Sequence, residues 1–201
     1  RYRDDSVTSA INRAAGGAAI SVDPETASLL DFAAELHAQS DGAFDLTSGV
    51  LRRAWDFKAG RVPSPAALDE LLQLVGWSRI EWHSPLLRMR ADMEIDFGGI
   101  GKEYAADRAA AIVAEFGGEH GLVNLGGDVR VIGPHADGQA WRIAVQDPRG
   151  EPGTTIAYLS VPQGAMATSG DYERFFVHEG RRYSHVLDPR TGWPVEHWRS
   201  V

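Results

Sequence analysis

The chain has 201 residues, of which 43% are hydrophobic and 24% are charged, so it is long enough to bury one sizeable core or two small ones. Its 28 acidic residues outnumber 20 basic ones, the formal net charge is -8, and no run of Lys or Arg is present, which argues against a nucleic-acid partner. The absence of cysteine excludes disulfides, thiolate catalysis and Cys-zinc sites. No stretch is apolar over the length that a membrane-spanning helix needs.

Start and stop signals predict three helices in the first half of the chain, over residues 6–13, 23–40 and 64–76. Ser6, Asp23 and Ser64 are the expected N-caps. The second helix is expected to bury an apolar face made of Leu29, Leu30, Phe32, Ala33 and Leu36. Shorter elements are predicted between the helices: a strand at 18–22, an extended piece at 43–47, a helical turn at 48–55 and a strand pair at 80–82 and 86–89.

The most distinctive stretch is an apolar pattern that runs through glycines into a helix. Residues 93–97 alternate as a half-buried strand, and glycines follow between positions 98 and 101. The helix predicted from Lys102 onwards carries apolar side chains at helical spacing, namely Ala105, Ala109, Ile112, Val113 and Phe116. In the first turn the charge of Lys102 opposes the helix dipole by roughly a few tenths of a kcal/mol, and an anionic group nearby would remove that conflict.

Two interpretations of this glycine loop are open, namely an anion site at a helix N-terminus and a plain tight turn beside a solvated lysine. The spacing matches neither a Walker A motif nor a dinucleotide fingerprint.

The second half of the chain is predicted to be mostly antiparallel sheet. Strand patterns separated by Gly, Pro and Asp cover residues 121–125, 129–132, 141–146, 155–161, 172–177 and 182–187. Helices concentrated early and strands concentrated late favour an α+β fold over a doubly wound parallel sheet.

Three further segments combine glycine with polar side chains. Residues 124–128 form a turn between two strands, where a hairpin needs Gly or Asn at positive φ. The hydroxyls and carboxylate at 167–172 suit either a polar ligand or a turn. Within residues 184–192, His185 faces away from Val186 on a strand, and Asp188 starts a tight turn that Gly192 closes. A lone strand histidine of this kind fits a structural role as well as a catalytic one, and Trp55 is expected in a core or interface.

Taken together, segments along the whole chain and in the expected order resemble the ApbE-type FAD:protein FMN transferases. They cover residues 2–6, 40–47, 96–107, 123–128, 167–172 and 183–192. The resemblance implies an α+β fold with an ApbE/T-fold-like core. It also implies a magnesium-dependent reaction in which FAD is cleaved, FMN is joined through a phosphoester to a threonine of an acceptor protein, and AMP is released.

The resemblance also implies roles for individual residues. Tyr2 would lie along the flavin, Ala43, Phe44 and Asp45 would line the FAD site, Asp96 and Lys102 would contact FAD, and Leu187 would close over it. Gly99 stands where the family supplies a metal ligand, so its backbone carbonyl would serve. His185 and Asp96 are the catalytic candidates, for proton transfer or substrate orientation.

Residues 1–201 are expected to form a single domain that is incomplete at both ends. In the family, a strand with a Met-Gly-Thr-like flavin contact precedes the region matching Arg1, and a metal motif containing Asp and Thr follows the region matching Val201. The implied partners are FAD and an acceptor flavoprotein, such as a subunit of a membrane redox complex. The implied location is periplasmic or extracytoplasmic, with any inner-membrane lipid anchor outside this chain. The alternatives are a protein that binds or hydrolyses FAD without transfer, and a non-catalytic remnant of the fold.

Overall fold

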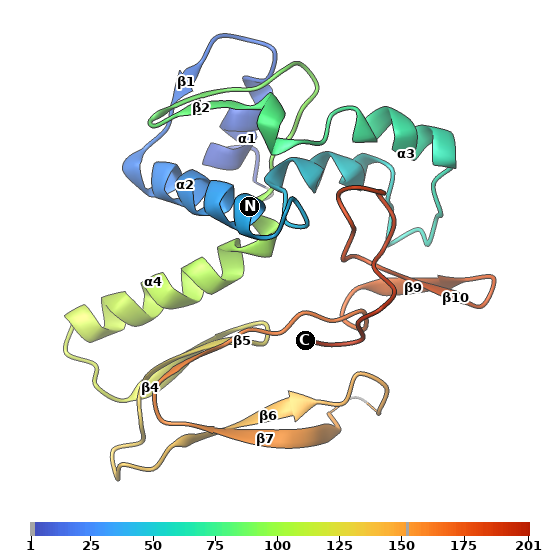
Figure 1. Ribbon diagram of the computed structural model, residues 1–201. Coiled ribbons are helices and arrows are strands. Elements are labelled where there is room, and N and C mark those ends of the chain that lie inside the picture. The colour runs from blue at the N-terminus through green and yellow to red at the C-terminus, as the bar shows by residue number, and fades with distance from the viewer. Residues whose placement is uncertain (1–2, 152) are drawn as a thin grey trace. The chain divides into compact units, whose positions relative to one another are not determined.

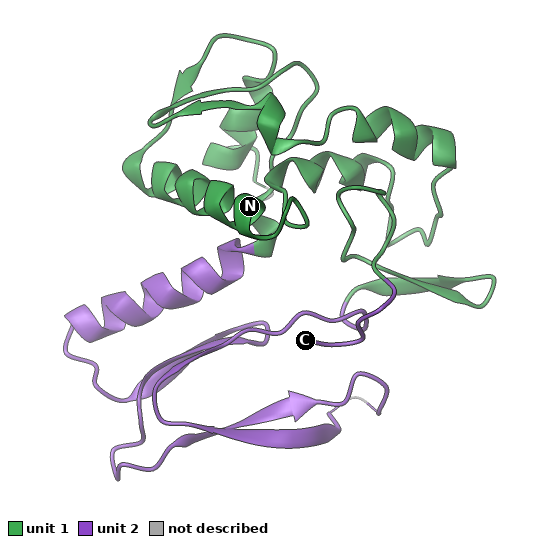
Figure 2. Cartoon of the chain, viewed as in Figure 1, with its two compact units in different colours: residues 1–99, 174–195 green, residues 100–173, 196–201 purple. Residues whose placement is uncertain are grey.

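The computed structural model describes residues 3–151 and 153–201, and the chain clusters into two compact units. Unit 1 is built from residues 1–99 and 174–195, and unit 2 from residues 100–173 and 196–201 (Figure 2). Tyr2, which the resemblance assigns to the flavin, lies outside the described residues. None of the described helices is long and apolar enough to cross a lipid bilayer.

The α-helices of unit 1 are α1 (Val7–Arg13), α2 (Pro24–Gln39) and α3 (Pro65–Leu72) (Figure 1). Each begins directly after its predicted cap, because the side chains of Ser6, Asp23 and Ser64 accept hydrogen bonds from the backbone N–H groups three residues further on. The sequence prediction of these three starts is therefore confirmed. The third helix ends before position 76, at Leu72.

The buried face of α2 differs from the expected one. Its buried residues are Thr26, Ala27, Leu30 and Ala33, whereas Phe32 is 52% exposed. Phe32 follows Leu30 by two positions, which places it roughly 200° further round the helix. The expectation that Phe32 faces the core is therefore wrong.

The remaining elements of unit 1 are short. Strands β1 (Ile20–Ser21), β2 (Glu81–His83) and β3 (Leu86–Arg88) form an antiparallel sheet in the order β1-β3-β2. Strands β9 (Phe175–His178) and β10 (Arg181–Ser184) form a hairpin. The 3₁₀ helices are η1 (Leu46–Arg53), η2 (Trp77–Arg79) and η3 (Phe97–Gly99). The strand pair predicted at 80–89 is thus confirmed, and η1 occupies most of the predicted turn at 48–55.

Residues 93–97 do not form the strand that their alternation predicts. Met93, Ile95 and Phe97 are all buried, as a period of two requires, but residues 93–96 join no sheet and η3 begins at Phe97. A side chain of α1 takes the place of a neighbouring strand, because the Asn12 amide hydrogen-bonds both backbone groups of Ile95. Alternation therefore predicted the burial correctly and the strand wrongly.

One hydrophobic cluster of unit 1 joins residues of η1, α3 and β10 and the segments that follow η1 and β10. Its buried side chains are Val50, Leu51, Trp55, Leu68 and Tyr183. The Trp55 indole N–H donates to the Gly192 carbonyl oxygen at 2.8 Å, and the Trp55 ring lies 5.6 Å from that of Trp193 and 5.7 Å from that of Tyr183. This cluster confirms Trp55 as a core residue.

Unit 2 consists of one long helix and antiparallel strands. The helix is α4 (Gly101–Glu115), and the strands are β4 (Gly121–Leu125), β5 (Asp128–Gly133), β6 (Trp141–Gln146), β7 (Thr155–Val161) and β8 (Gly164–Met166). Strands β4, β5 and β8 form one sheet in that order, β6 and β7 form a hairpin, and α4 packs against β4 and β5 (Figure 1). Val129, Val131 and Ile143 form a buried hydrophobic cluster. The predicted α+β class is confirmed, although the three-residue β8 was not predicted.

The apolar stripe that predicted α4 is not the face that the helix buries. The buried side chains are Ala106 and Ala110, whereas Phe116 is 88% exposed and Ile112 and Val113 are exposed as well. The buried alanines are each one position after members of the stripe, so the two faces differ by roughly 100° around the helix. Small alanine side chains let the helix approach the sheet closely.

Candidate functional site

The segment after α2 is ordered by the carboxylate of Asp45. This side chain is buried and accepts hydrogen bonds from the Thr47 backbone N–H at 2.8 Å, the Thr47 hydroxyl at 2.6 Å and the Trp77 backbone N–H at 2.9 Å. It thereby caps η1 and joins that helix to η2. Ala43 is exposed and Phe44 is half-buried, so these two side chains lie nearer the surface than Asp45.

The loop that carries Asp96 packs directly on this segment. The Asp96 backbone N–H donates to the Leu46 carbonyl oxygen at 2.9 Å, and Asp96 Oδ1 accepts from the Gly98 backbone N–H at 2.8 Å. A Cβ atom on Gly49 would lie 2.6 Å from the Asp96 Cβ, and one on Gly99 would lie 2.9 Å from Cε2 of Phe44. Both glycines are therefore required by close approach, and the fold brings together three predicted site residues of unit 1: Phe44, Asp96 and Gly99.

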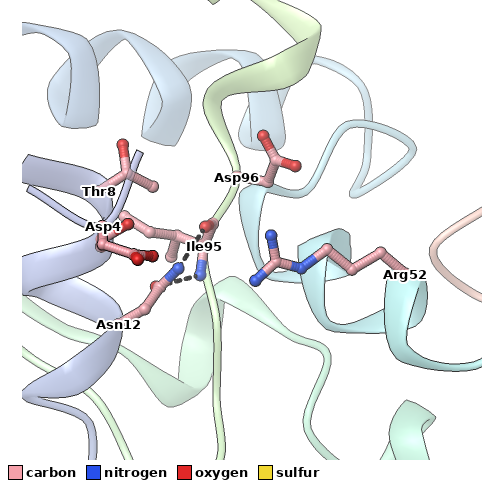
Figure 3. Close-up of a pocket in the computed structure, with 7 residues that line it drawn as sticks. Asp4, Thr8, Asn12, Arg52, Ile95 and Asp96 are labelled. Carbon is pink, nitrogen blue, oxygen red and sulfur yellow. Dashed lines mark hydrogen bonds between the residues drawn. The ribbon is translucent and has the colours of Figure 1, made fainter. Parts of the chain in front are cut away.

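Asp96 also lines a small polar pocket of unit 1. The pocket has a volume of about 180 Å³ and is lined by Asp4, Thr8, Ser9, Asn12, Arg52, Ile95 and Asp96. In Figure 3, Thr8 and Asn12 come from one side of it, while Arg52 and Asp96 come from the other. Two carboxylates, a guanidinium group, hydroxyls and an amide give this pocket both donors and acceptors for a polar ligand.

His185 and Leu187 lie on the segment that follows β10. The His185 backbone N–H donates to the Arg174 carbonyl oxygen at 3.0 Å, and its ring Nδ1 lies 3.2 Å from the same oxygen. An Nδ1–H that donates to this carbonyl would fix the orientation of the ring. The side chain is exposed, as access to a substrate requires. Leu187 pairs with Pro194 and packs against the Trp55 core cluster.

The predicted turn after Leu187 is confirmed. The Gly192 backbone N–H donates to the Asp188 carbonyl oxygen at 2.8 Å, and Asp188 Oδ1 accepts from the Arg190 backbone N–H at 2.8 Å. Gly192 has a φ of 72° and packs against Leu51 in the core of unit 1.

In unit 2, Lys102 has the anionic neighbour that its position in the helix demands. Its ammonium group pairs with the carboxylate of Asp128, which is 2% exposed and also accepts from the Thr168 backbone N–H at 3.1 Å. No side chain caps the N-terminus of α4, so this pair offsets the unfavourable position of a cation there. Three segments of unit 2 therefore meet at the Asp128 carboxylate: the loop of Lys102, the turn before Asp128 and the segment of Thr168.

The hairpin turn before Asp128 also has the predicted backbone conformation. Gly126 and Gly127 both have positive φ, and the Gly127 backbone N–H donates to Asn124 Oδ1 at 2.9 Å. The polar segment at 167–172 is joined to the β6–β7 loop, because Arg149 donates to both carboxylate oxygens of Asp171, at 2.7 and 2.6 Å. These hydrogen bonds raise the pKa of Arg149 further above its already high value.

Within residues 3–151 and 153–201, no three His, Asp or Glu side chains cluster in a way that could hold a metal ion. Gly99, the predicted metal ligand, offers its backbone carbonyl oxygen. Magnesium takes about six oxygen ligands and commonly keeps several waters. The described side chains therefore do not make up a metal site by themselves.

Three residues of these arrangements were missed by sequence reasoning. Asp128 could have been found, because a carboxylate at an inward position of a strand needs a buried partner. Asn12 carries no such signal, since asparagine near the end of a short helix is ordinary. Arg52, which lines the pocket and donates to Glu94 at 2.6 Å, is likewise indistinguishable in sequence from a solvated arginine.

Solved structures of flavin transferases have the same fold. The crystal structure of the ApbE protein from Thermotoga maritima matches with a TM-score of 0.90 and 40% identity, over 97% of this chain and 64% of that one. The apo flavinyl transferase ApbE of Pseudomonas stutzeri matches with a TM-score of 0.81 and 33% identity, over 98% of this chain and 62% of that one. The mixed helical and antiparallel architecture is therefore that of an ApbE flavin transferase.

Sequence comparison leads to the same family. The model of the ApbE family matches residues 1–201, and the chain belongs to that family. It is 32% identical over 205 residues to the FAD:protein FMN transferase of Salmonella typhimurium, and 31% identical over 211 residues to that of Treponema pallidum. These alignments cover 98% and 96% of this chain but 59% and 58% of the relatives, so the chain spans less than two thirds of their length.

Proposed function

We propose that this protein is an FAD:protein FMN transferase. In the proposed reaction, a threonine hydroxyl of an acceptor protein attacks the phosphorus atom on the FMN side of the FAD pyrophosphate. A new phosphoester bond forms as the pyrophosphate bond breaks, AMP leaves with the bridging oxygen, and the hydroxyl proton passes to a base. The printed names of the relatives and membership of the ApbE family support this proposal.

The observation that carries the proposal is the packing of two separate FAD-associated segments in unit 1. The segment of Phe44 and the loop of Asp96 to Gly99 are joined by the hydrogen bond between Asp96 and Leu46. Gly49 and Gly99 leave no room for a side chain where the two segments meet. Such close packing of bare backbone fixes ligand-contacting groups before a ligand arrives, which lowers the entropic cost of binding.

Each proposed contact has a physical basis. Lys102 carries positive charge at a helix start that no side chain caps, a combination that favours a phosphate. Asp96 presents a carboxylate whose orientation is set by the Gly98 N–H, and it serves as an acceptor for FAD. His185 is proposed to take the threonine proton, with Asp96 as the second catalytic candidate. The remaining proposed FAD contacts are Tyr2, Ala43, Phe44, Asp45 and Leu187.

Magnesium is part of the proposal. When bound, the ion would neutralise charge on the pyrophosphate oxygens as the leaving group departs. Among the described residues, only the Gly99 carbonyl is proposed as a ligand. None of the roles given above to Asp96, Lys102 or His185 depends on the metal.

We further propose that the acceptor is a flavoprotein with a target threonine, of the kind found as a subunit of membrane redox complexes. The reaction would then take place in the periplasm or another extracytoplasmic compartment. This part rests on the family resemblance. Cell fractionation checks it, because recovery of the protein in the cytosolic fraction would contradict the location.

Two variants separate binding from chemistry. Lys102→Ala is expected to weaken FAD binding more than it slows turnover, because it removes positive charge from the phosphate site. His185→Ala is expected to slow turnover with little change in FAD affinity, because it removes the proposed base. The measurements are fluorescence titration with FAD and the rate of AMP release.

The Lys102 variant needs a control for the loss of its ion pair. Asp128→Asn removes the charge of the partner while its side-chain oxygen still accepts from Thr168. It should change FAD affinity less than Lys102→Ala does. Wild-type affinity and turnover in both the Lys102 and His185 variants would contradict the site assignment.

A further inference from the structure

The side chain of Asn12, in α1, hydrogen-bonds both backbone groups of Ile95, the residue directly before Asp96. Its Nδ2 donates to the Ile95 carbonyl oxygen at 3.0 Å, and its Oδ1 accepts from the Ile95 backbone N–H at 2.9 Å (Figure 3). The two hydrogen bonds fix the orientation of the amide, because only one assignment of nitrogen and oxygen satisfies both. The contact joins positions that are 83 residues apart.

These two hydrogen bonds replace the ones that a neighbouring strand would make to the backbone of Ile95. Ile95 is 1% exposed, so its backbone groups need partners inside the protein, and residues 93–96 join no sheet that could supply them. Asn12 satisfies both groups and lies at the wall of the polar pocket. Loss of the amide would leave a buried donor and a buried acceptor unpaired directly before Asp96.

Asp96 is held from its other side by unrelated contacts. Its backbone N–H donates to the Leu46 carbonyl oxygen, its Oδ1 accepts from Gly98, and its Cβ fills the space left by Gly49. Asn12 is thus the only one of these contacts that comes from α1. Asn12 holds the carbonyl end of the peptide between Ile95 and Asp96, Leu46 holds its N–H end, and this peptide leads directly into the Asp96 Cα.

We propose that Asn12 is a positioning residue for FAD binding, which acts by holding Asp96 in the orientation that accepts the ligand. The inference rests on the proposed function and adds a residue to it. Asn12 itself is not assigned a contact with FAD. Its effect on affinity should therefore depend on the presence of the Asp96 carboxylate.

A double-mutant cycle on the protein tests this dependence, with FAD affinity measured by fluorescence titration. Asn12→Ala is expected to weaken FAD binding roughly tenfold, by analogy with the lower end of the effect known for partners that orient metal-ligating side chains. In the Asp96→Ala background the same substitution should change the affinity by less than about twofold, because there is no carboxylate left to position.

Further variants separate positioning from general destabilisation. Asn12→Asp keeps an acceptor for the Ile95 N–H but loses the donor to the Ile95 carbonyl, so it should give an intermediate loss of affinity. Ser64→Ala removes the cap of α3 in the same unit and should lower the thermal unfolding temperature while leaving FAD affinity unchanged. Amide hydrogen exchange at Ile95 should accelerate in Asn12→Ala, which removes the acceptor of this N–H, and remain as in the wild type in Ser64→Ala.

The outcomes are distinct. An equal loss of affinity in the wild-type and Asp96→Ala backgrounds would overturn the inference, as would unchanged FAD binding in Asn12→Ala. A wild-type protein that binds no FAD would instead overturn the proposed function.

Discussion

Asp45 illustrates how a single carboxylate can serve the fold at a position where ligand contact is proposed. Its three hydrogen bonds to Thr47 and Trp77 join the segment after α2 to η1 and η2. This buried carboxylate thereby holds the backbone that directly follows Phe44. The stability of an Asp45 variant therefore has to be measured together with its FAD affinity, because a destabilised unit 1 would weaken binding by itself.

Replacing Asp45 by alanine should destabilise unit 1 by about 3 kcal/mol, because three donors lose a charged acceptor and two of them are backbone groups. Urea unfolding followed by tryptophan fluorescence measures the change. Asp92→Asn is the matched control, because Asp92 is an exposed carboxylate at a φ of 64°, where asparagine is tolerated. The control should change stability by less than about 0.5 kcal/mol. Equal effects of the two substitutions would contradict the structural role of Asp45.

Among single residues, the sequence predicted those that act on near neighbours in the chain and missed those whose partners are distant in sequence. The caps Ser6, Asp23 and Ser64 act within three residues, and each was predicted correctly. Asn12 acts on a residue 83 positions away, which no local pattern encodes. Asp128 was read as part of a turn, although its carboxylate is the anion that the position of Lys102 requires.

Among the elements, α2 offers a pH-dependent test of its cap. Asp23 accepts hydrogen bonds from the Thr26 hydroxyl at 2.6 Å and from the Thr26 backbone N–H at 3.0 Å. The hydroxyl hydrogen bond, followed by the backbone one, lowers the pKa of Asp23 below its ordinary value. A lowered pKa in the folded state means that the charged cap stabilises the fold above the unfolded pKa of about 3.9. That contribution is lost as the pH falls through the folded pKa.

Asp23→Ala should therefore cost about 1 kcal/mol at neutral pH, and the difference from wild type should shrink as the solution is acidified. The free energy of unfolding, measured at a series of pH values, checks this. Asp23→Ser retains an uncharged cap, so its stability relative to Asp23→Ala should not vary with pH. If the stability difference between wild type and Asp23→Ala grew as the pH fell, the proposed role of the charged cap would be contradicted.

The junction of η1 with the Asp96 loop depends on a glycine. Gly49→Ala would bring a methyl group to within 2.6 Å of the Asp96 Cβ and 3.0 Å of the Asp96 backbone nitrogen. Overpacking of this kind costs about 1–3 kcal/mol, and the loop would have to move. The variant should therefore lose both stability and FAD affinity.

Gly138→Ala provides the comparison for that variant. Gly138 has a φ of 82° and open space around it, so an alanine there is strained by about 1–2 kcal/mol without a steric clash. It should reduce stability and leave FAD affinity unchanged. Unaltered FAD binding in Gly49→Ala would show that the packing of the two segments does not shape the ligand site.

Periodicity predicted most elements but not always the faces that they bury. Strands at 121–125, 141–146 and 155–161 were predicted with the observed bounds. For α4 the apolar stripe is the exposed face, because the helix packs through Ala106 and Ala110. The apolar alternation of residues 93–97 could not reveal that a side-chain amide, and not a strand, completes the backbone hydrogen bonds of Ile95.

For the whole molecule, the absence of cysteine excluded disulfide-stabilised and Cys-zinc proteins, and the net negative charge argued against a nucleic-acid partner. Neither observation identified the family. The family was recognised from motifs spread along residues 2–192, and the match of the family model over residues 1–201 agrees with that recognition. The structure adds how the motifs are held, with Phe44 and the Asp96 loop packed together in unit 1 and Lys102 paired with Asp128 in unit 2. The roles of these residues in FAD chemistry are predictions from the resemblance.

The central claim is transfer of FMN to a protein threonine, and mass spectrometry of an acceptor tests it most directly. The protein is incubated with FAD, Mg²⁺ and an acceptor carrying the target threonine, beside the same acceptor with that threonine replaced by alanine. We predict that the threonine acceptor gains one FMN phosphoester, that AMP is released in equal amount, and that the alanine acceptor gains nothing. Release of FMN and AMP with an unmodified acceptor, or FAD bound intact, would contradict the claim.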